Sequence, residues 1–304
     1  MEKKLYGSIK LIGNNWVIDC EPHVKTKLKR VFPQVRQSAS QVIMITNNQE
    51  NCHDLLWFID RYPMKVENLK HLKGESKKYK ELKNDILDVL NYSRPTMQFQ
   101  LAEPAFTYQA SAAELLLQVR GLLLADELGL GKTVSSICPM LIPENLPALF
   151  VTLTHLPSQI QAELKRFAPH LKTHILTKTT PYPLSDEGEN PPDVIIGSYS
   201  KLNGWAEQLR GKVNYVILDE IQELRTGDGS LKYIAAKHIA EAANLRMGLS
   251  GTPIYGYGHE FYNVLSILRP NILGTREEFI REWCNSDNNI FDPKAFGTYL
   301  REEG

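Results

Sequence analysis

The chain has 304 residues, of which 42% are hydrophobic and 23% charged, with a formal net charge of zero and no low-complexity tract. This is the composition of a globular protein large enough for two domains, and it excludes collagen-like and disordered chains. Four scattered cysteines without C-x-x-C spacing exclude a zinc ribbon and a disulfide framework. No signal peptide and no apolar run near the ~20 residues of a membrane helix are found, so we expect a cytoplasmic protein with no membrane partner.

Residues 1–95 predict a small α/β domain. Two apolar runs flank Gly13 to Asn15, which indicates a hairpin, and Pro22 opens the first helical pattern. The charged helix that ends this domain contains Gly74, a candidate break, and Ser93 to Thr96 indicate a linker. The expected elements are strands over 6–12, 16–19 and 42–46 and helices over 22–32, 51–62 and 67–92.

The net charge of zero hides an asymmetry along the chain. Residues 1–95 hold 17 Lys and Arg against 11 Asp and Glu, a charge of +6, and the rest holds 18 against 24, a charge of −6. A basic front segment suggests contact with a phosphate backbone. The alternatives are a solvated surface or the docking of a partner protein. The basic residues concentrate at Lys25, Lys27, Lys29 and Arg30 and at Lys70, Lys73, Lys77, Lys78, Lys80 and Lys83.

Residues 96–304 predict an α/β domain with a parallel sheet between helices, because apolar strand patterns alternate with helical ones. Residues 177–192, rich in Pro, Thr and acidic side chains, are expected to form a mobile, exposed loop. Helices are expected to begin near Lys132, Pro157, Tyr199 and Leu231. The expected strands cover 121–125, 148–152, 173–176, 194–197, 213–218 and 246–249.

The segment from Gly121 to Thr133 has the pattern of a phosphate-binding loop. An apolar strand is followed by a loop with two glycines and then by Lys132 and Thr133 at the start of a helix. Glycines let backbone N–H groups point at phosphate oxygens, and the helix N-terminus adds positive potential. We expect Lys132 to act in catalysis on the β- and γ-phosphates of ATP, and the Thr133 hydroxyl to hold Mg²⁺. The alternative is an ordinary strand-to-helix turn, since the strict pattern has glycine where this chain has Asp126. The expected nucleotide-binding residues of this loop are Leu128, Gly129, Leu130, Gly131, Lys132 and Thr133.

Two later segments supply the rest of the expected site. The apolar run 213–218 predicts a buried parallel strand and is followed by Asp219 and Glu220. Ligands of open α/β sheets bind at the carboxyl ends of the strands, so Asp219 is expected to hold Mg²⁺ and Glu220 to act on the attacking water. After the next strand, Ser250 and Thr252 offer uncharged hydroxyls near the phosphates.

In this order, the three segments resemble the first RecA-like lobe of superfamily-two helicases, specifically the Swi/Snf-type DNA translocases, over residues 106–284. In that family the loop commonly reads Asp-Glu-x-Gly-Leu-Gly-Lys-Thr, so Asp126 fits the family pattern. The similarity is to phage and bacterial members. It implies ATP and Mg²⁺ as cofactors, and DNA, expected to be double-stranded, as partner.

The resemblance also implies roles for residues outside the loop. Tyr108 and Gln109 lie in the upstream segment where a glutamine reads adenine, and Gln109 precedes the nucleotide strand by the length of one helix. The family's nucleic-acid segment is matched after the second strand, although Leu153 stands where a proline is usual. The residues matched there are Thr154, His155 and Gln159.

Two functions are consistent with these expectations. The first is the ATP-binding lobe of a DNA-dependent ATPase that moves along or remodels duplex DNA. The second is a nucleotide-gated adaptor that binds DNA or a partner protein without productive hydrolysis. After Cys284 the chain runs only 20 residues further, too few for the family's second RecA-like lobe, so we expect that lobe to be absent here. The alternatives are a truncated chain, half of a split enzyme and a stand-alone lobe.

Overall fold

The computed structural model describes residues 4–32, 35, 42–185, 190–252, 257–270 and 272–303. The chain divides into two compact units, 1–91 and 92–304, which we call the small and the large unit. Within the described ranges, no helix has the length and apolar character needed to cross a membrane.

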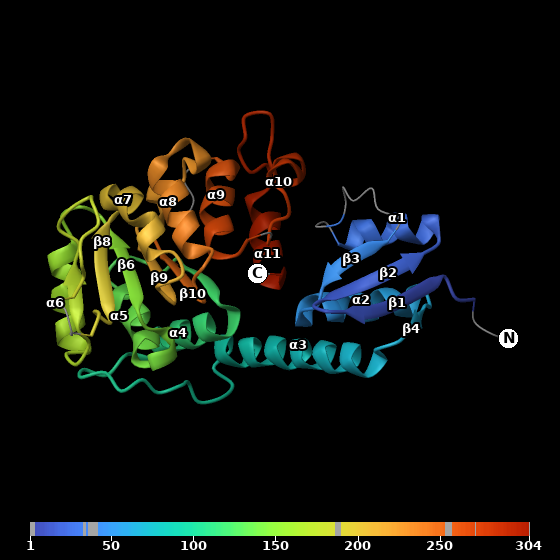
Figure 1. The fold of residues 1–304 in the computed structure, drawn as a ribbon, viewed down its shortest axis with the longest axis horizontal. Coiled ribbons are helices and arrows are strands. Elements are labelled where there is room, and N and C mark those ends of the chain that lie inside the picture. The colour runs from blue at the N-terminus through green and yellow to red at the C-terminus, as the bar shows by residue number, and fades with distance from the viewer. Residues whose placement is uncertain are drawn as a thin grey trace. The chain divides into compact units, whose positions relative to one another are not determined.

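The small unit combines a sheet with helices, drawn from blue to cyan in Figure 1. Its elements are β1 (Gly7–Ile12), β2 (Asn15–Cys20), α1 (Pro22–Val31), β3 (Ile43–Thr46), α2 (Gln49–Arg61), β4 (Lys65–Val66) and α3 (Leu69–Leu90). The strand order is β3-β2-β1-β4. β2 pairs antiparallel with β1 and β3, and β4 pairs parallel with β1. The predicted hairpin is confirmed, and Gly13 at its turn has a φ of +58°, a conformation that favours glycine.

The core of the small unit lies between the sheet and all three of these helices. Alternate strand residues are buried, as expected for a sheet with one covered face, and they meet apolar residues of α1, α2 and α3 in one cluster. Trp16 is fully buried at its centre, and its indole N–H lies 3.1 Å from Oδ1 of Asn47 and 3.2 Å from Sγ of Cys52. The indole therefore ties β2 to the start of α2.

Two features of the small unit differ from the sequence prediction. The candidate break at Gly74 is wrong, because α3 runs without interruption. A Cβ at Gly74 would meet no atom within 4 Å, so the glycine fills no special role, and the buried Leu72 and Ser76 hold the helix on either side of it. β4 was not predicted.

The large unit is built on a parallel six-stranded sheet in the order β5-β10-β9-β6-β8-β7. Its strands are β5 (Gly121–Leu124), β6 (Ala148–Thr152), β7 (Thr173–Ile175), β8 (Val194–Ser198), β9 (Tyr215–Asp219) and β10 (Leu245–Leu249). Its α-helices are α4 (Thr107–Val119), α5 (Lys132–Ile137), α6 (Pro157–Phe167), α7 (Tyr199–Leu209), α8 (Leu231–Ala240), α9 (Gly258–Leu268), α10 (Arg276–Trp283) and α11 (Pro293–Glu303). Short 3-10 helices are η2 (Cys138–Leu141), η3 (Pro143–Asn145), η4 (Ile221–Leu224) and η5 (Gly227–Gly229).

Helices cover both faces of this sheet (Figure 1). Apolar residues of α4, α5 and α6 form one core with the sheet, and those of α7, α8 and α9 form another. Neighbouring strand residues alternate between the two cores: Leu149 and Val151 face one, and Ala148 and Phe150 face the other. This doubly covered parallel sheet confirms the predicted α/β class, because only strands buried on both faces give such continuous apolar runs.

The loop expected to be mobile and exposed over 177–192 is anchored in its described first part. The Tyr182 hydroxyl accepts a hydrogen bond from the backbone N–H of Thr177 at 3.0 Å, and its ring packs edge-to-face on Trp205 at 5.1 Å. The Trp205 indole donates to the Lys178 carbonyl at 3.0 Å. The prediction of an exposed loop is confirmed for this part, where residues 177–181 and 183 are exposed, and Tyr182 and Trp205 fix the loop to α7.

Gly204 of α7 allows the loop backbone at Thr179 to approach the helix closely, and this contact can be tested by its effect on stability. A Cβ at Gly204 would lie 1.8 Å from the carbonyl oxygen of Thr179, so Gly204→Ala must displace the loop backbone. We expect a loss of roughly 1–3 kcal/mol in the unfolding free energy of the large unit, as for other overpacked sites, measured by urea denaturation. Gly229→Ala is the control, because a Cβ there meets nothing within 4 Å. Equal stability of the two variants would contradict the anchoring.

Candidate functional site

The carboxyl ends of four neighbouring strands, β5, β10, β9 and β6, lie at one level of the parallel sheet. Leu249 of β10 is in register with Leu124 of β5 on one side and with Asp219 of β9 on the other. β6 follows, with Val151 opposite Leu218, so Thr152 comes next to Asp219. The segments that leave these strands therefore meet at the same edge, where open α/β sheets bind their ligands.

The loop after β5 curls through two left-handed glycines. Gly129 has a φ of +87° and Gly131, which precedes α5, a φ of +70°. A Cβ at Gly131 would lie 2.5 Å from Nε2 of Gln109, so this glycine is also needed for space. At the tip of the loop, Leu128 is 79% exposed and Leu130 is 39% exposed. The backbone here takes a curled form that a chain with side chains at both glycines would not adopt.

The Lys132 side chain folds back onto this loop. Its ammonium group donates to the carbonyl oxygens of Asp126 at 2.9 Å and Glu127 at 3.0 Å. A Cβ at Gly251, in the segment after β10, would lie 4.0 Å from the same nitrogen. The positive charge of Lys132 is thus close to two of the three converging segments. In the third, burial raises the pKa of Asp219, and the charge of Lys132 is one of the smaller effects that oppose this rise.

Helix α4 holds the loop from outside. Gln109 is buried, and its amide nitrogen donates to the carbonyls of Leu130 at 3.0 Å and Gly131 at 3.4 Å. Its amide oxygen accepts from the backbone N–H of Phe106 at 3.0 Å. The Tyr108 hydroxyl donates to the Leu130 carbonyl at 3.0 Å. Both ends of the Gln109 amide are engaged by the protein, so reading a base requires the amide to exchange partners.

Asp219, the last residue of β9, carries a half-buried carboxylate. Burial raises its pKa above the ordinary value. A hydrogen bond from the Thr152 hydroxyl to Oδ2 of Asp219, at 2.7 Å, opposes this rise, and the neighbouring charge of Glu220 adds to it. Thr152 is completely buried. No sequence pattern signals this pair, because Thr152 ends an apolar strand and its partner lies 67 residues away.

Glu220 occupies a left-handed conformation with a φ of +50°. This region disfavours residues with a side chain by about 1–2 kcal/mol, so surrounding contacts must hold the backbone there. The side-chain amide of Gln222 donates to Oε2 of Glu220, and the Tyr199 hydroxyl donates to the carbonyl of Asp219 at 2.8 Å. The other end of the Gln222 amide, Oε1, is buried with no partner among the described residues. Two side chains therefore fix the turn that presents Glu220.

The segment after β10 begins with Ser250, which is buried. Its backbone N–H donates to the Leu124 carbonyl at 3.1 Å, and its hydroxyl accepts from the N–H of Thr252 at 3.0 Å. Ser250 thus links the end of β10 to the end of β5. Pro253 and Ile254, which belong to the same sequence motif, lie outside the described residues.

Comparison with known proteins assigns the chain to a family. A family model described as the SNF2-related domain matches residues 11–294. The chain belongs to this family. The expected resemblance to Swi/Snf-type proteins is confirmed, and the chain is an SNF2-family domain homologous to ATP-dependent helicases and chromatin remodellers.

Curated relatives match part of this SNF2-family domain. It is 28% identical over 169 residues to an uncharacterised ATP-dependent helicase of Mycoplasma pneumoniae, covering 52% of this chain and 16% of the relative. It is 26% identical over 191 residues to the protein CHROMATIN REMODELING 19 of Arabidopsis thaliana, covering 56% and 25%. It is 29% identical over 227 residues to the chromatin-remodeling ATPase INO80 of Schizosaccharomyces pombe, covering 65% of this chain and 14% of the relative. The chain thus spans a quarter or less of the length of these relatives.

A solved structure shares the fold. The SWI2/SNF2 ATPase core of Sulfolobus solfataricus in complex with dsDNA superposes with a TM-score of 0.57 at 20% identity, covering 69% of this chain and 46% of that chain. At this identity the similarity shows the fold alone. It confirms the RecA-like architecture of the large unit.

The residues that the sequence predicts to contact nucleic acid lie at the same end of the sheet. Thr154 and His155 form a turn directly after β6, and both are exposed. Gln159 is exposed on α6. These residues therefore lie at the carboxyl end of the strand next to Asp219, on a surface open to a partner.

The donor set of the edge suits Mg²⁺. A threonine hydroxyl and a carboxylate, from Thr133 and Asp219, are hard oxygen ligands of the kind this ion takes. Within the described chain, no cluster of three or more His, Cys, Asp or Glu side chains could form a metal site. Mg²⁺ bound with a nucleotide needs no such cluster, because phosphates and water complete its shell.

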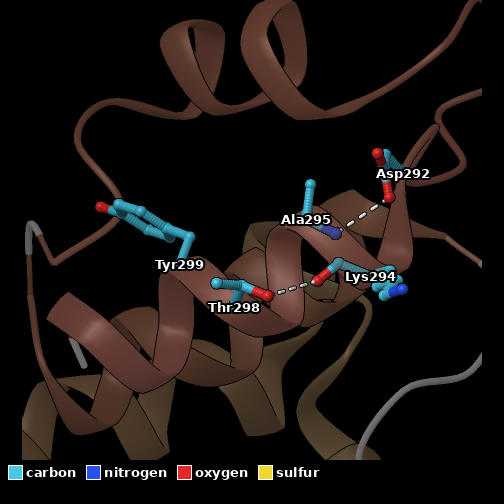
Figure 2. A pocket seen from close by; sticks show the side chains of 5 residues that line it. All are labelled: Asp292, Lys294, Ala295, Thr298 and Tyr299. Atoms are coloured by element: carbon cyan, nitrogen blue, oxygen red, sulfur yellow. Dashed lines mark hydrogen bonds between the residues drawn. The ribbon is translucent and has the colours of Figure 1, made fainter.

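A separate hollow lies at α11, and none of its lining residues belongs to these loops. Figure 2 shows its lining by Asp292, Lys294, Ala295, Thr298 and Tyr299. Oδ1 of Asp292 accepts from the N–H of Ala295 at 2.9 Å, and the Thr298 hydroxyl donates to the Lys294 carbonyl at 3.1 Å. These polar groups serve the helix itself, so the hollow shows no convergent ligand-binding set.

The contribution of the hydrogen bond between Thr152 and Asp219 to stability can be tested by mutation. Thr152→Val keeps the side-chain shape but removes a hydrogen bond to a charged acceptor, so we expect a loss of about 1.5–3 kcal/mol in unfolding free energy. In an Asp219→Asn background the same substitution should cost less, because the acceptor is no longer charged. Urea denaturation of the four proteins of this cycle measures the coupling. An equal loss in both backgrounds would show that Thr152 contributes only packing.

Proposed function

We propose that the chain is the ATP-binding lobe of a DNA-dependent ATPase of the Swi/Snf type, which hydrolyses ATP to move along or remodel duplex DNA. The observation that supports this best is the position of Lys132. Its ammonium group lies in the curled loop, close to Gly251 and within electrostatic reach of Asp219, so one charge serves all three segments.

In this proposal the loop residues 128–133 bind the phosphates of ATP. Backbone N–H groups of the curled loop and the N-terminus of α5 provide the donors. The two carbonyls that now hold Lys132 are weaker partners than phosphate oxygens, so the ammonium group exchanges them for the β- and γ-phosphates. Tyr108 and Gln109 lie against the same loop and are the proposed contacts of the adenine end.

Thr133 and Asp219 are the proposed Mg²⁺ ligands. The ion would neutralise charge on the β- and γ-phosphates when bound. Thr152 serves by orienting Asp219 through the hydrogen bond to its Oδ2.

Glu220 is the proposed base that orients or deprotonates the attacking water. Its left-handed backbone and the hydrogen bond from Gln222 hold the carboxylate in a defined direction. A base fixed in this way needs no rearrangement at the moment of reaction, which is where positioned general bases gain their effect.

DNA is the proposed partner at the same edge. The solved SWI2/SNF2 core with a similar fold was determined with dsDNA, which supports this choice. We assign backbone contacts to Thr154, His155 and Gln159, which are exposed beside the site. Ser250 and Thr252 lie between the phosphate loop and Asp219, and we propose that they couple nucleotide state to DNA.

Full activity is proposed to need a second RecA-like lobe, in the same protein or another chain. An arginine supplied to the transferring phosphoryl group is worth ~10³–10⁵ in rate in related enzymes. We therefore expect this chain alone to bind ATP but hydrolyse it slowly.

Lys132→Ala tests the nucleotide assignment. Loss of charge-assisted hydrogen bonds worth about 1.5–3 kcal/mol should weaken the binding of a non-hydrolysable ATP analogue by about 10–100-fold. Isothermal titration calorimetry with Mg²⁺ present measures this, and a thermal melt checks the fold. Unchanged affinity in a folded variant would sink the phosphate-loop assignment.

Glu220→Gln tests the enzyme assignment. The variant should keep its affinity for MgATP and lose turnover by about 10²–10⁴-fold, because the carboxylate acts on the water and not on the bound ground state. Turnover is measured with duplex DNA and a supplied second lobe. Glu223→Gln is the matched control, since Glu223 pairs with Lys232 at 2.5 Å and should leave turnover unchanged. ATP binding by the wild-type chain without turnover under any of these conditions would favour the nucleotide-gated adaptor.

A further inference from the structure

Helix α3 of the small unit carries lysines along one face. Lys70, Lys73, Lys77 and Lys80 are separated by three, four and three residues, a spacing that aligns them along the helix, and all four are exposed. We call them the α3 lysine stripe. The buried Leu72 and Ser76 lie on a neighbouring side of α3, and the stripe itself lies on the exposed side of the helix.

Most of the positive charge of the stripe is uncompensated. Lys77 pairs with Glu81 at 3.3 Å, whereas the other three lysines form no ion pair or hydrogen bond within the described chain. The acidic residue between them, Glu75, lies off the stripe and pairs with Lys78 at 2.6 Å. A helix face that is merely solvated usually alternates the signs of its charges, and this one does not.

The positive charges of α3 affect a histidine on the neighbouring helix α2. His53 of α2 lies beside α3, with Nδ1 3.2 Å from the Ser76 hydroxyl. Burial lowers the pKa of His53, and the charges of Lys80 and Lys83 lower it further. The lysines of α3 thus create a local excess of positive charge that an anionic partner would relieve.

We propose that the α3 lysine stripe binds the phosphate backbone of duplex DNA. From Lys70 to Lys80 the helix rises about 15 Å, at ~1.5 Å per residue. Phosphates of one DNA strand follow at ~3.4 Å along the duplex axis, so the stripe spans about four of them. Lysines at this spacing give charge without base recognition, so the contact is independent of sequence. The choice of DNA rests on the proposed function of the large unit, and the stripe is a second contact outside that unit's site.

The test compares two charge-matched variants of the full chain. In the first, Lys70, Lys73 and Lys80 are replaced by Gln, which retains helix propensity. In the second, the exposed Lys10, Lys27 and Lys65 of the same unit are replaced by Gln, which removes the same charge elsewhere. Binding to a fluorescent duplex is measured without nucleotide over a series of salt concentrations.

The stripe variant should bind more weakly at low salt, and its slope of log K against log salt should be smaller by up to ~2.7, at ~0.9 for each phosphate that a lysine no longer neutralises. The control variant should keep a slope close to that of the wild type. Equal slopes in all three proteins, equal changes in both variants, or no duplex binding by the wild type would overturn the proposal. The first outcome would leave the stripe as a solvated or protein-binding surface. ATP-analogue affinity and turnover depend on other residues, so the proposed function is judged independently.

Discussion

The parallel register of β5, β10, β9 and β6 is the constraint on which the candidate site depends. In a parallel sheet all carboxyl ends meet at one edge, and here Leu124, Leu249 and Asp219 stand at the same level. Segments far apart in sequence therefore leave the sheet next to one another. A shift of one residue in any of these strands would turn its core residues to the opposite face, so burial of both faces fixes the register and, with it, the site. The two hydrophobic cores are thus what position the polar loops.

Side-chain hydrogen bonds from several elements then arrange the edge. Gln109 of α4 holds the loop, Thr152 of β6 holds Asp219, and Gln222 of η4 holds Glu220. Each of these bonds is made by a buried side chain. Hydrogen bonds in such a place compete less with solvent. Lys132 is the exception, since its partners are loop carbonyls that a phosphate can replace. The site therefore combines a fixed frame with one exchangeable charge, as a site for a polyanionic ligand requires.

The sequence predicted the large sheet because strands buried on both faces leave uninterrupted apolar runs. The phosphate-loop residues stay a prediction, which rests on glycine, lysine and threonine at a fixed spacing. It missed β4, which has two residues and no pattern. It missed Thr152, since a hydroxyl at the end of an apolar strand is indistinguishable from a packing residue until its partner is known. It predicted the exposed loop over 177–185 but not its anchor, because nothing in the polar composition indicates that Tyr182 packs on Trp205. These failures all involve contacts between residues distant in sequence.

The central claim is that the edge formed by these strands binds the phosphates of ATP through Lys132. A crystal structure of the chain with Mg²⁺ and a non-hydrolysable ATP analogue tests this most directly. We predict that the ammonium group of Lys132 leaves the carbonyls of Asp126 and Glu127 and contacts the β- and γ-phosphates, with the metal between Thr133 and Asp219. An analogue bound elsewhere, or bound at this edge with Lys132 still on the two carbonyls, would contradict the claim.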